Sequence, residues 1–122
     1  MTAADAIRAL LQTTLQGWSV QFGHWIDPGA QVRSALIRPV GGPAVERVRR
    51  PQFTLSLIGL AGGDRAEVSE AAERVIALLQ TTSGALVNVQ AGEPTYIPTA
   101  DGRPVLEIAL SAIANAPEGA IA

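Results

Sequence analysis

Apolar residues recur along this chain with two different periods, and the period predicts the secondary structure of each segment. A helical period over residues 2–16, and again from residue 64 to about residue 80, places apolar side chains on one face of each segment. A period of two, as in Phe53, Leu55 and Leu57 between polar neighbours, predicts a half-buried strand. The pattern predicts strands over residues 32–39, 52–60, 85–90, 94–98 and 104–114.

Turn and capping residues divide these elements. Asp64 and Glu67 form a capping-box pattern at the start of the second helix. Gly23 and the Asp-Pro-Gly turn at residues 27–29 interrupt the segment after the first helix, so no long regular element is predicted there. The Asp101-Gly102 dipeptide favours a tight turn before the last strand.

The order of the elements predicts the fold class. A helix, two strands, a helix and three strands favour an α+β fold, with two helices packed on one face of a mostly antiparallel sheet. The 122 residues are typical of one domain. We expect that domain to span residues 1–116 and to be followed by a flexible tail at residues 117–122.

Composition excludes several classes of function. The chain has no cysteine, which excludes disulfides, thiolate metal sites and a cysteine nucleophile. Its formal net charge of −2 argues against sequence-independent binding of nucleic acid. No apolar run approaches the roughly 20 residues that span a bilayer. The opening residues lack the basic start of a secretory signal, so we expect a cytosolic origin and no membrane contact.

Candidate catalytic and metal-binding residues are few. His24 is the only histidine and has no serine or cysteine partner nearby, so a polar place in an aromatic turn is favoured over a general base. Glu67, Glu70 and Glu73 recur every three residues with arginines among them, which is more typical of a solvated helix face than of a cation site. The sequence therefore predicts no enzyme, no metal ligand and no cofactor.

The polar segment at residues 41–51 is long for a simple hairpin and alternates apolar with charged residues. It is either a solvent-exposed hairpin or a contact arm with apolar anchors and arginines alongside. The candidate interface residues are Val45, Glu46, Arg47, Val48, Arg49 and Arg50.

The aromatic segment WSVQFGHWIDPG also has two interpretations. Trp18, Phe22 and Trp25 either pack the junction between helix and sheet, or lie at a subunit seam, since tryptophan is enriched at interface hot spots. Together with the closing hairpin, this segment resembles the tail-terminator family of long-tailed bacteriophages. The residues that carry the resemblance are Trp18, Gln21, Phe22, Gly23, Trp25, Ile26 and Asp27, then Asp101, Gly102, Arg103, Pro104 and Val105.

The resemblance implies a small α+β domain that forms a ring, usually of six subunits, on the head-proximal end of the tail tube. Such a ring stops tube polymerisation and presents a surface for head joining. Its partners are other copies of itself, the tail tube protein and head-closure or connector proteins, and DNA passes through it without sequence-specific binding. The implied location is the neck of the virion, after assembly in the host cytoplasm. We expect Arg47, Arg49 and Arg50 to pair with acidic neighbours in the ring or tube.

Two other functions stay open at this stage. A head–tail connector or head-completion protein is also a small α+β ring former. A small-ligand-binding or enzymatic domain is the alternative of a different class, and its pocket would be formed by Trp18, Phe22, His24 and Trp25.

Overall fold

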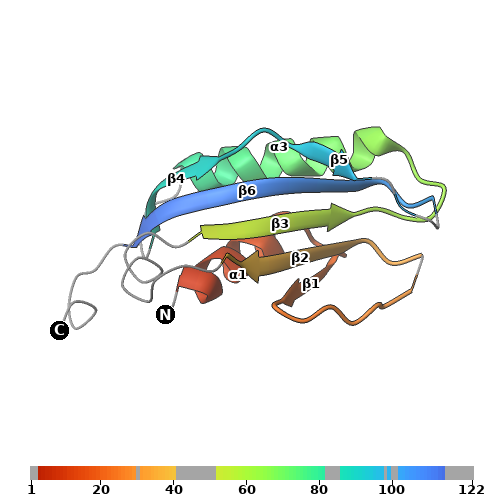
Figure 1. The fold of residues 1–122 in the computed structure, drawn as a ribbon, viewed down its shortest axis with the longest axis horizontal. Helices are drawn as coiled ribbons and strands as arrows, with labels where there is room; N and C mark the ends of the chain where they lie inside the picture. Colours follow the sequence, from red (N-terminus) through yellow and green to blue (C-terminus); the bar gives the residue numbers. More distant parts are fainter. Residues whose placement is uncertain are drawn as a thin grey trace.

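The computed structural model describes residues 3–29, 31–40, 52–81, 86–97, 99 and 102–114. A six-stranded sheet and two helices form an α+β fold, which confirms the predicted class (Figure 1). The elements are α1 (Ala3–Thr14), β1 (Ser19–Phe22), β2 (Ser34–Pro39), β3 (Gln52–Ile58), α3 (Arg65–Thr81), β4 (Leu86–Ala91), β5 (Thr95–Ile97) and β6 (Val105–Ala114). The predicted contact arm at residues 41–51, the turn residue Asp101 and the tail at residues 117–122 lie outside the described residues.

The sheet is mostly antiparallel, as predicted. Its strand order is β1-β2-β3-β6-β4, and β5 also pairs with β6. Only the β1–β2 pair is parallel among the five strand pairs described. β6 is the longest of the strands and pairs with β3 on one side and with β4 and β5 on the other (Figure 1).

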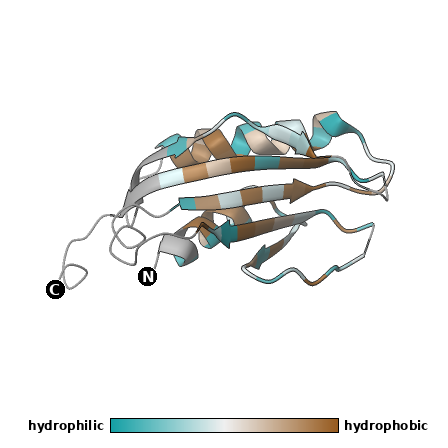
Figure 2. Ribbon diagram, viewed as in Figure 1, coloured by the Kyte–Doolittle hydropathy of each residue, from teal (hydrophilic) through white to brown (hydrophobic). Residues whose placement is uncertain are grey.

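One face of the sheet carries the core. Phe53, Leu55 and Leu57 of β3 are buried, and they lie opposite buried apolar residues of β6 in register. Figure 2 shows this alternation of apolar and polar positions along the central strands. Both helices contribute to the same cluster, so they cover the same face, in agreement with the sequence pattern. The helical members of the core are Ile7, Leu11, Val68, Ala71, Ala72, Val75 and Leu79, and Leu15, which directly follows α1, joins them.

The strand β1 was not among the predicted strands, because the turn residues of this segment excluded only a long regular element. Val20 lies opposite Ala35, and Phe22 lies opposite Ile37, in parallel pairing with β2. Both β1 side chains pack against the core cluster. Gly23, with a φ of 81°, ends this strand without preventing it. Four residues are too few to display a period, and the strand is defined by its parallel pairing with β2, across the loop that joins them.

Candidate interaction surface

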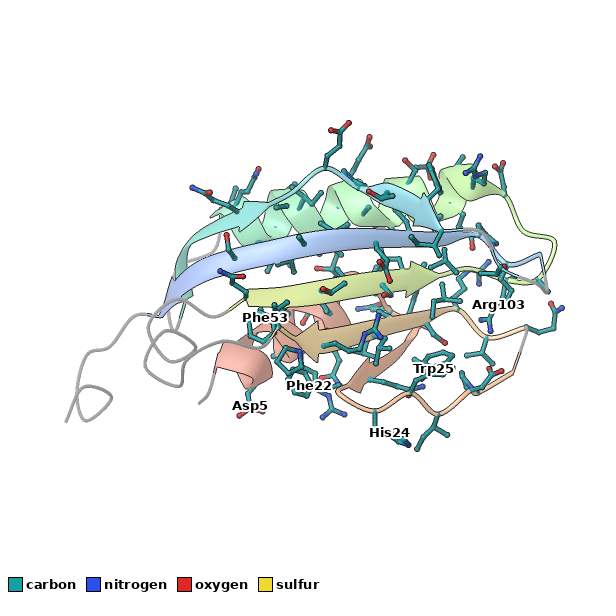
Figure 3. All side chains as sticks on the ribbon, viewed as in Figure 1. Asp5, Phe22, His24, Trp25, Phe53 and Arg103 are labelled. Atoms are coloured by element: carbon teal, nitrogen blue, oxygen red, sulfur yellow. The ribbon has the colours of Figure 1, made fainter. Side chains whose placement is uncertain are left out.

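The two sequence motifs meet at one end of the sheet, where β3 ends and β6 begins. Asp27, from the aromatic segment, and Arg103, from the closing hairpin, form an ion pair with 3.5 Å between Oδ1 and Nη1. The Arg103 side chain is only 4% exposed, whereas that of Asp27 is 61% exposed. The structure therefore joins two motifs that are far apart in the sequence, and Arg103 lies at this junction (Figure 3).

Arg103 holds several strand ends together through its guanidinium group. Nε donates a hydrogen bond of 2.9 Å to the carbonyl of Gly59, which follows β3. Nη2 donates one of 2.7 Å to the carbonyl of Val32, which precedes β2. A buried charge is unfavourable unless it is hydrogen-bonded and paired, and these carbonyls together with Asp27 meet that need. Arg103 is thus a positioning residue and not an exposed contact.

Pro104 packs beside this junction against a glycine. The Gly59 N–H donates a hydrogen bond of 2.8 Å to the Pro104 carbonyl. A Cβ atom at Gly59 would lie 2.7 Å from Pro104 Cγ and 3.2 Å from Val68 Cγ1. The start of β6, the end of β3 and the helix α3 therefore approach so closely here that only a glycine fits without displacement.

Gln21 fixes the loop that follows β1. Its amide Nε2 donates to the Ile26 carbonyl at 2.7 Å, and its Oε1 accepts from the Ile26 N–H at 2.8 Å. Asp27 adds a turn bond, since its Oδ1 accepts from the Gly29 N–H at 2.9 Å. Ile26 itself is 68% exposed. The motif residues thus hold an exposed aliphatic side chain on a loop with defined backbone hydrogen bonds.

The four aromatic-segment residues that were candidates for a ligand pocket do not converge. Trp18 and Phe22 pack against the core, and the Phe22 ring meets Phe53 edge-on at 6.4 Å between centroids. Trp25 is half-buried, whereas His24 is exposed and points away from the body of the protein (Figure 3). Trp18 and Phe22 are therefore partly buried against the core of the subunit.

Two surface hollows are present in the described part of the chain. One, of about 360 Å³, is lined by residues that include Arg65, Tyr96 and Arg103. The Arg65 guanidinium lies 4.0 Å from the centre of the Tyr96 ring at the rim of this hollow. The other, of about 370 Å³, lies over β3, β4 and β6. Neither is lined by the four aromatic-segment residues named above.

Glu67 has a different partner from the one that the capping-box pattern predicts. Asp64 accepts a hydrogen bond of 2.9 Å from the Ala66 N–H and caps α3 as predicted. The Glu67 carboxylate instead forms a two-bond ion pair with Arg33, at 2.5 and 3.0 Å. These bonds lower the pKa of Glu67 and raise that of Arg33. A bidentate pair of opposite charges is the stronger alternative to a return bond to the helix start.

Glu67→Gln is therefore expected to lower the free energy of unfolding at neutral pH and to lose this effect in acid. Because the folded-state pKa of Glu67 is depressed, its contribution is complete above the ordinary value of 4.5 and disappears as the pH falls through the lower folded value. Urea unfolding of both proteins over a series of pH values measures the difference. Glu70→Gln, at an exposed position of the same helix, controls for the loss of one surface charge. A difference that stays constant into acid would contradict this assignment.

The remaining acidic candidates of the sequence lie on the surface of α3. Glu70 and Glu73 are exposed on α3. No group of three His, Cys, Asp or Glu is placed to hold a metal ion in the part of the chain that the structure describes. Among the described helices, none is long and apolar enough to cross a membrane. The candidate interface residues Val45 to Arg50 lie outside the described residues.

A family model described as "Phage tail termination protein" matches residues 1–116, a span that includes both sequence motifs and every described element. No curated protein matches the chain.

Proposed function

The chain belongs to the family of phage tail termination proteins, and on that premise we propose that it forms a ring that caps the head-proximal end of the tail tube. Membership in the family assigns a structural role in completing a phage tail, with a location in the tail of the virion. The family match over residues 1–116 is the observation that carries the proposal.

The proposed mechanism is binding and not catalysis. One face of the ring repeats the interface that a tube subunit offers, and the other face cannot accept a further tube ring. Polymerisation then stops, and the second face receives the head-closure or connector proteins. Since a ring needs two different patches on each subunit, the contacts between copies are head-to-tail.

The proposed partners follow from this position in the neck. They are other copies of the chain, six in the expected ring, the tail tube protein and the head-closure proteins. DNA passes through the ring without sequence-specific binding, and the net charge of −2 suits a channel that does not retain it.

The segment at residues 41–50 is the proposed contact arm toward the ring or the tube. Replacement of Arg47, Arg49 and Arg50 by Glu is expected to weaken binding to purified tail tubes by at least about 30-fold, as for loss of buried interfacial charge pairs. The thermal unfolding midpoint should stay near that of the unmodified protein. Negative-stain microscopy of capped tube ends over a series of protein concentrations measures the binding, and thermal unfolding followed by circular dichroism measures the midpoint.

A control variant with three equal charge reversals separates the arm from general electrostatics. Arg8, Arg65 and Arg74 lie at exposed positions of α1 and α3, and their replacement by Glu should leave capping intact. Unchanged capping by the arm variant would remove the arm from the interface. Binding of the unmodified protein to tail-free heads, and not to tubes, would overturn tube capping in favour of the head–tail connector.

A further inference from the structure

Arg65 is an exposed arginine that an aromatic ring holds in place at the start of α3. Its guanidinium lies over the Tyr96 ring, 4.0 Å from the ring centre. The Tyr96 hydroxyl donates a long hydrogen bond of 3.5 Å to the Arg65 carbonyl. Three other arginines form ion pairs with carboxylates, but Arg65 has no carboxylate partner among the described residues. The structure therefore holds a positive charge at a defined place without neutralising it there.

A guanidinium over an aromatic ring can still bind an anion. Its N–H donors lie in the plane of the group and point outward from the edge, so the ring covers a face and not the donors. Two of these donors match the two oxygens of a carboxylate. Because Tyr96 already restricts the Arg65 side chain, binding a carboxylate requires little further ordering. Arginine and tyrosine are also enriched at the energetic centres of protein interfaces.

The hollow of about 360 Å³ beside this pair suits a carboxylate that is followed by an apolar side chain. Ile97 of β5 and Val105 of β6 give it an apolar lining. No aspartate or glutamate is among the described residues that line it. Arg103 also lines the hollow, but its guanidinium already binds two backbone carbonyls. Arg65 is thus the arginine that is placed to receive a carboxylate in this hollow.

The hollow and the proposed contact arm are associated with opposite ends of the sheet. The arm follows β2 and precedes β3, at the end where Pro39 pairs with Phe53. The hollow lies where β3 ends and β6 begins, and there Ile58 pairs with Val105 (Figure 1). Since the arm end is assigned to the ring or the tube, the end with the hollow is available to a partner on the head side.

We propose that the hollow beside Arg65 binds an acidic segment of the head-closure or connector protein, with Arg65 donating two hydrogen bonds to a carboxylate of that segment. This inference rests on the proposed function and specifies the chemistry of its head-side partner. Arg65→Gln removes the charge and the paired donors, so it should weaken head joining by roughly 10- to 100-fold.

Joining of heads to capped tubes tests the site. Tubes capped with Arg65→Gln are mixed with tail-free heads, and joined particles are counted by negative-stain microscopy over a series of head concentrations. The variant should cap tubes normally but require more heads for half-maximal joining, by the factor given above. Arg74→Gln changes an exposed arginine of the same helix that does not line the hollow, and it should join heads normally. Normal joining by Arg65→Gln would overturn the proposal.

Two variants of Tyr96 test whether the ring positions the arginine. Tyr96→Phe keeps the ring and should join heads nearly as well as the unmodified protein. Tyr96→Leu removes the ring and should approach the loss expected for Arg65→Gln. The thermal unfolding midpoint of each variant shows whether the fold is kept. Equal joining by two folded variants would reject the role of the ring.

Heads emptied of their DNA distinguish a protein carboxylate from a DNA phosphate. The same dependence on Arg65 with emptied heads would support an acidic protein segment. A dependence that disappears with emptied heads would identify DNA as the ligand and overturn the proposal. Normal capping with joining that does not depend on Arg65 would reject the site and leave the cap in place. Binding to heads that depends on Arg65, without capping of tubes, would support the site and reject tube capping.

Discussion

Arg103→Met is expected to lower the free energy of unfolding by about 3 kcal/mol, since a buried and a partly buried carbonyl lose a charged donor and each such loss costs roughly 1–3 kcal/mol. Those carbonyls belong to Gly59 and Val32, at 2.9 and 2.7 Å from the guanidinium. The methionine keeps the apolar length of the side chain, so lost packing makes a small contribution. Urea unfolding measures the change in the free energy of unfolding.

Two further variants define the cause. Arg38→Met removes an arginine that is half-exposed and pairs with Glu107 at 3.4 Å, so its effect should not exceed about 1 kcal/mol. Arg103→Lys keeps the charge but cannot reach both carbonyls from one ammonium group, and it should fall between the other two. Equal effects of Arg103→Met and Arg38→Met would show that the buried guanidinium adds nothing beyond a surface ion pair.

The parts of the fold that the sequence predicted are those whose pattern is contained in a single segment. β3 alternates over seven residues, and α3 repeats its apolar positions over 17 residues, so each displays its period without reference to a partner. β1 has four residues and is paired in parallel with β2, and its structure is set by that neighbour. A strand of this length can be identified only from its pairing in the folded sheet.

The residues of the candidate surface could likewise be predicted only in part, because their contacts involve distant segments of the chain. The resemblance selected Gln21, Ile26 and Arg103, but their roles did not follow from any spacing. Gln21 binds the backbone of Ile26, and Arg103 binds carbonyls of residues brought close only by the sheet. Because every residue has a backbone carbonyl, the sequence does not indicate which residue accepts a hydrogen bond from a given side chain.

At the start of α3, an ion pair with a residue distant in the sequence replaces one of the contacts that the local capping-box pattern predicts. The capping box correctly identified Asp64 as the cap, because that bond is made within two residues. Glu67 was wrongly assigned to the same box. Arg33 lies 34 positions away in the chain and binds both carboxylate oxygens. The spacing of residues predicts hydrogen bonds within one helical turn, but it does not predict an ion pair with a residue that only the folded chain brings close.

Gly59→Ala is the second substitution with a large expected effect, a loss of about 1–3 kcal/mol through overpacking. Two opposed contributions determine whether this substitution raises or lowers the free energy of unfolding. Alanine restricts the unfolded chain and by itself stabilises by about 0.4–1 kcal/mol where its backbone conformation fits. Against this, the new Cβ would lie 2.7 Å from Pro104 Cγ, a separation that requires displacement. The Pro104 ring is rigid and buried, so the overpacking term should exceed the gain.

Gly92→Ala provides the matched control for this change. A Cβ at Gly92 would lie 3.5 Å from Ala109 Cβ, an ordinary contact, so only the stabilising term should be seen, about 0.4–1 kcal/mol. The double variant Gly59→Ala with Pro104→Ala tests the contact itself. If the Pro104 ring is the obstacle, the double variant should be more stable than the sum of the two single effects, measured by urea unfolding. Simple additivity would place the cost of Gly59→Ala at Val68 Cγ1, 3.2 Å from the new atom, instead of at the proline.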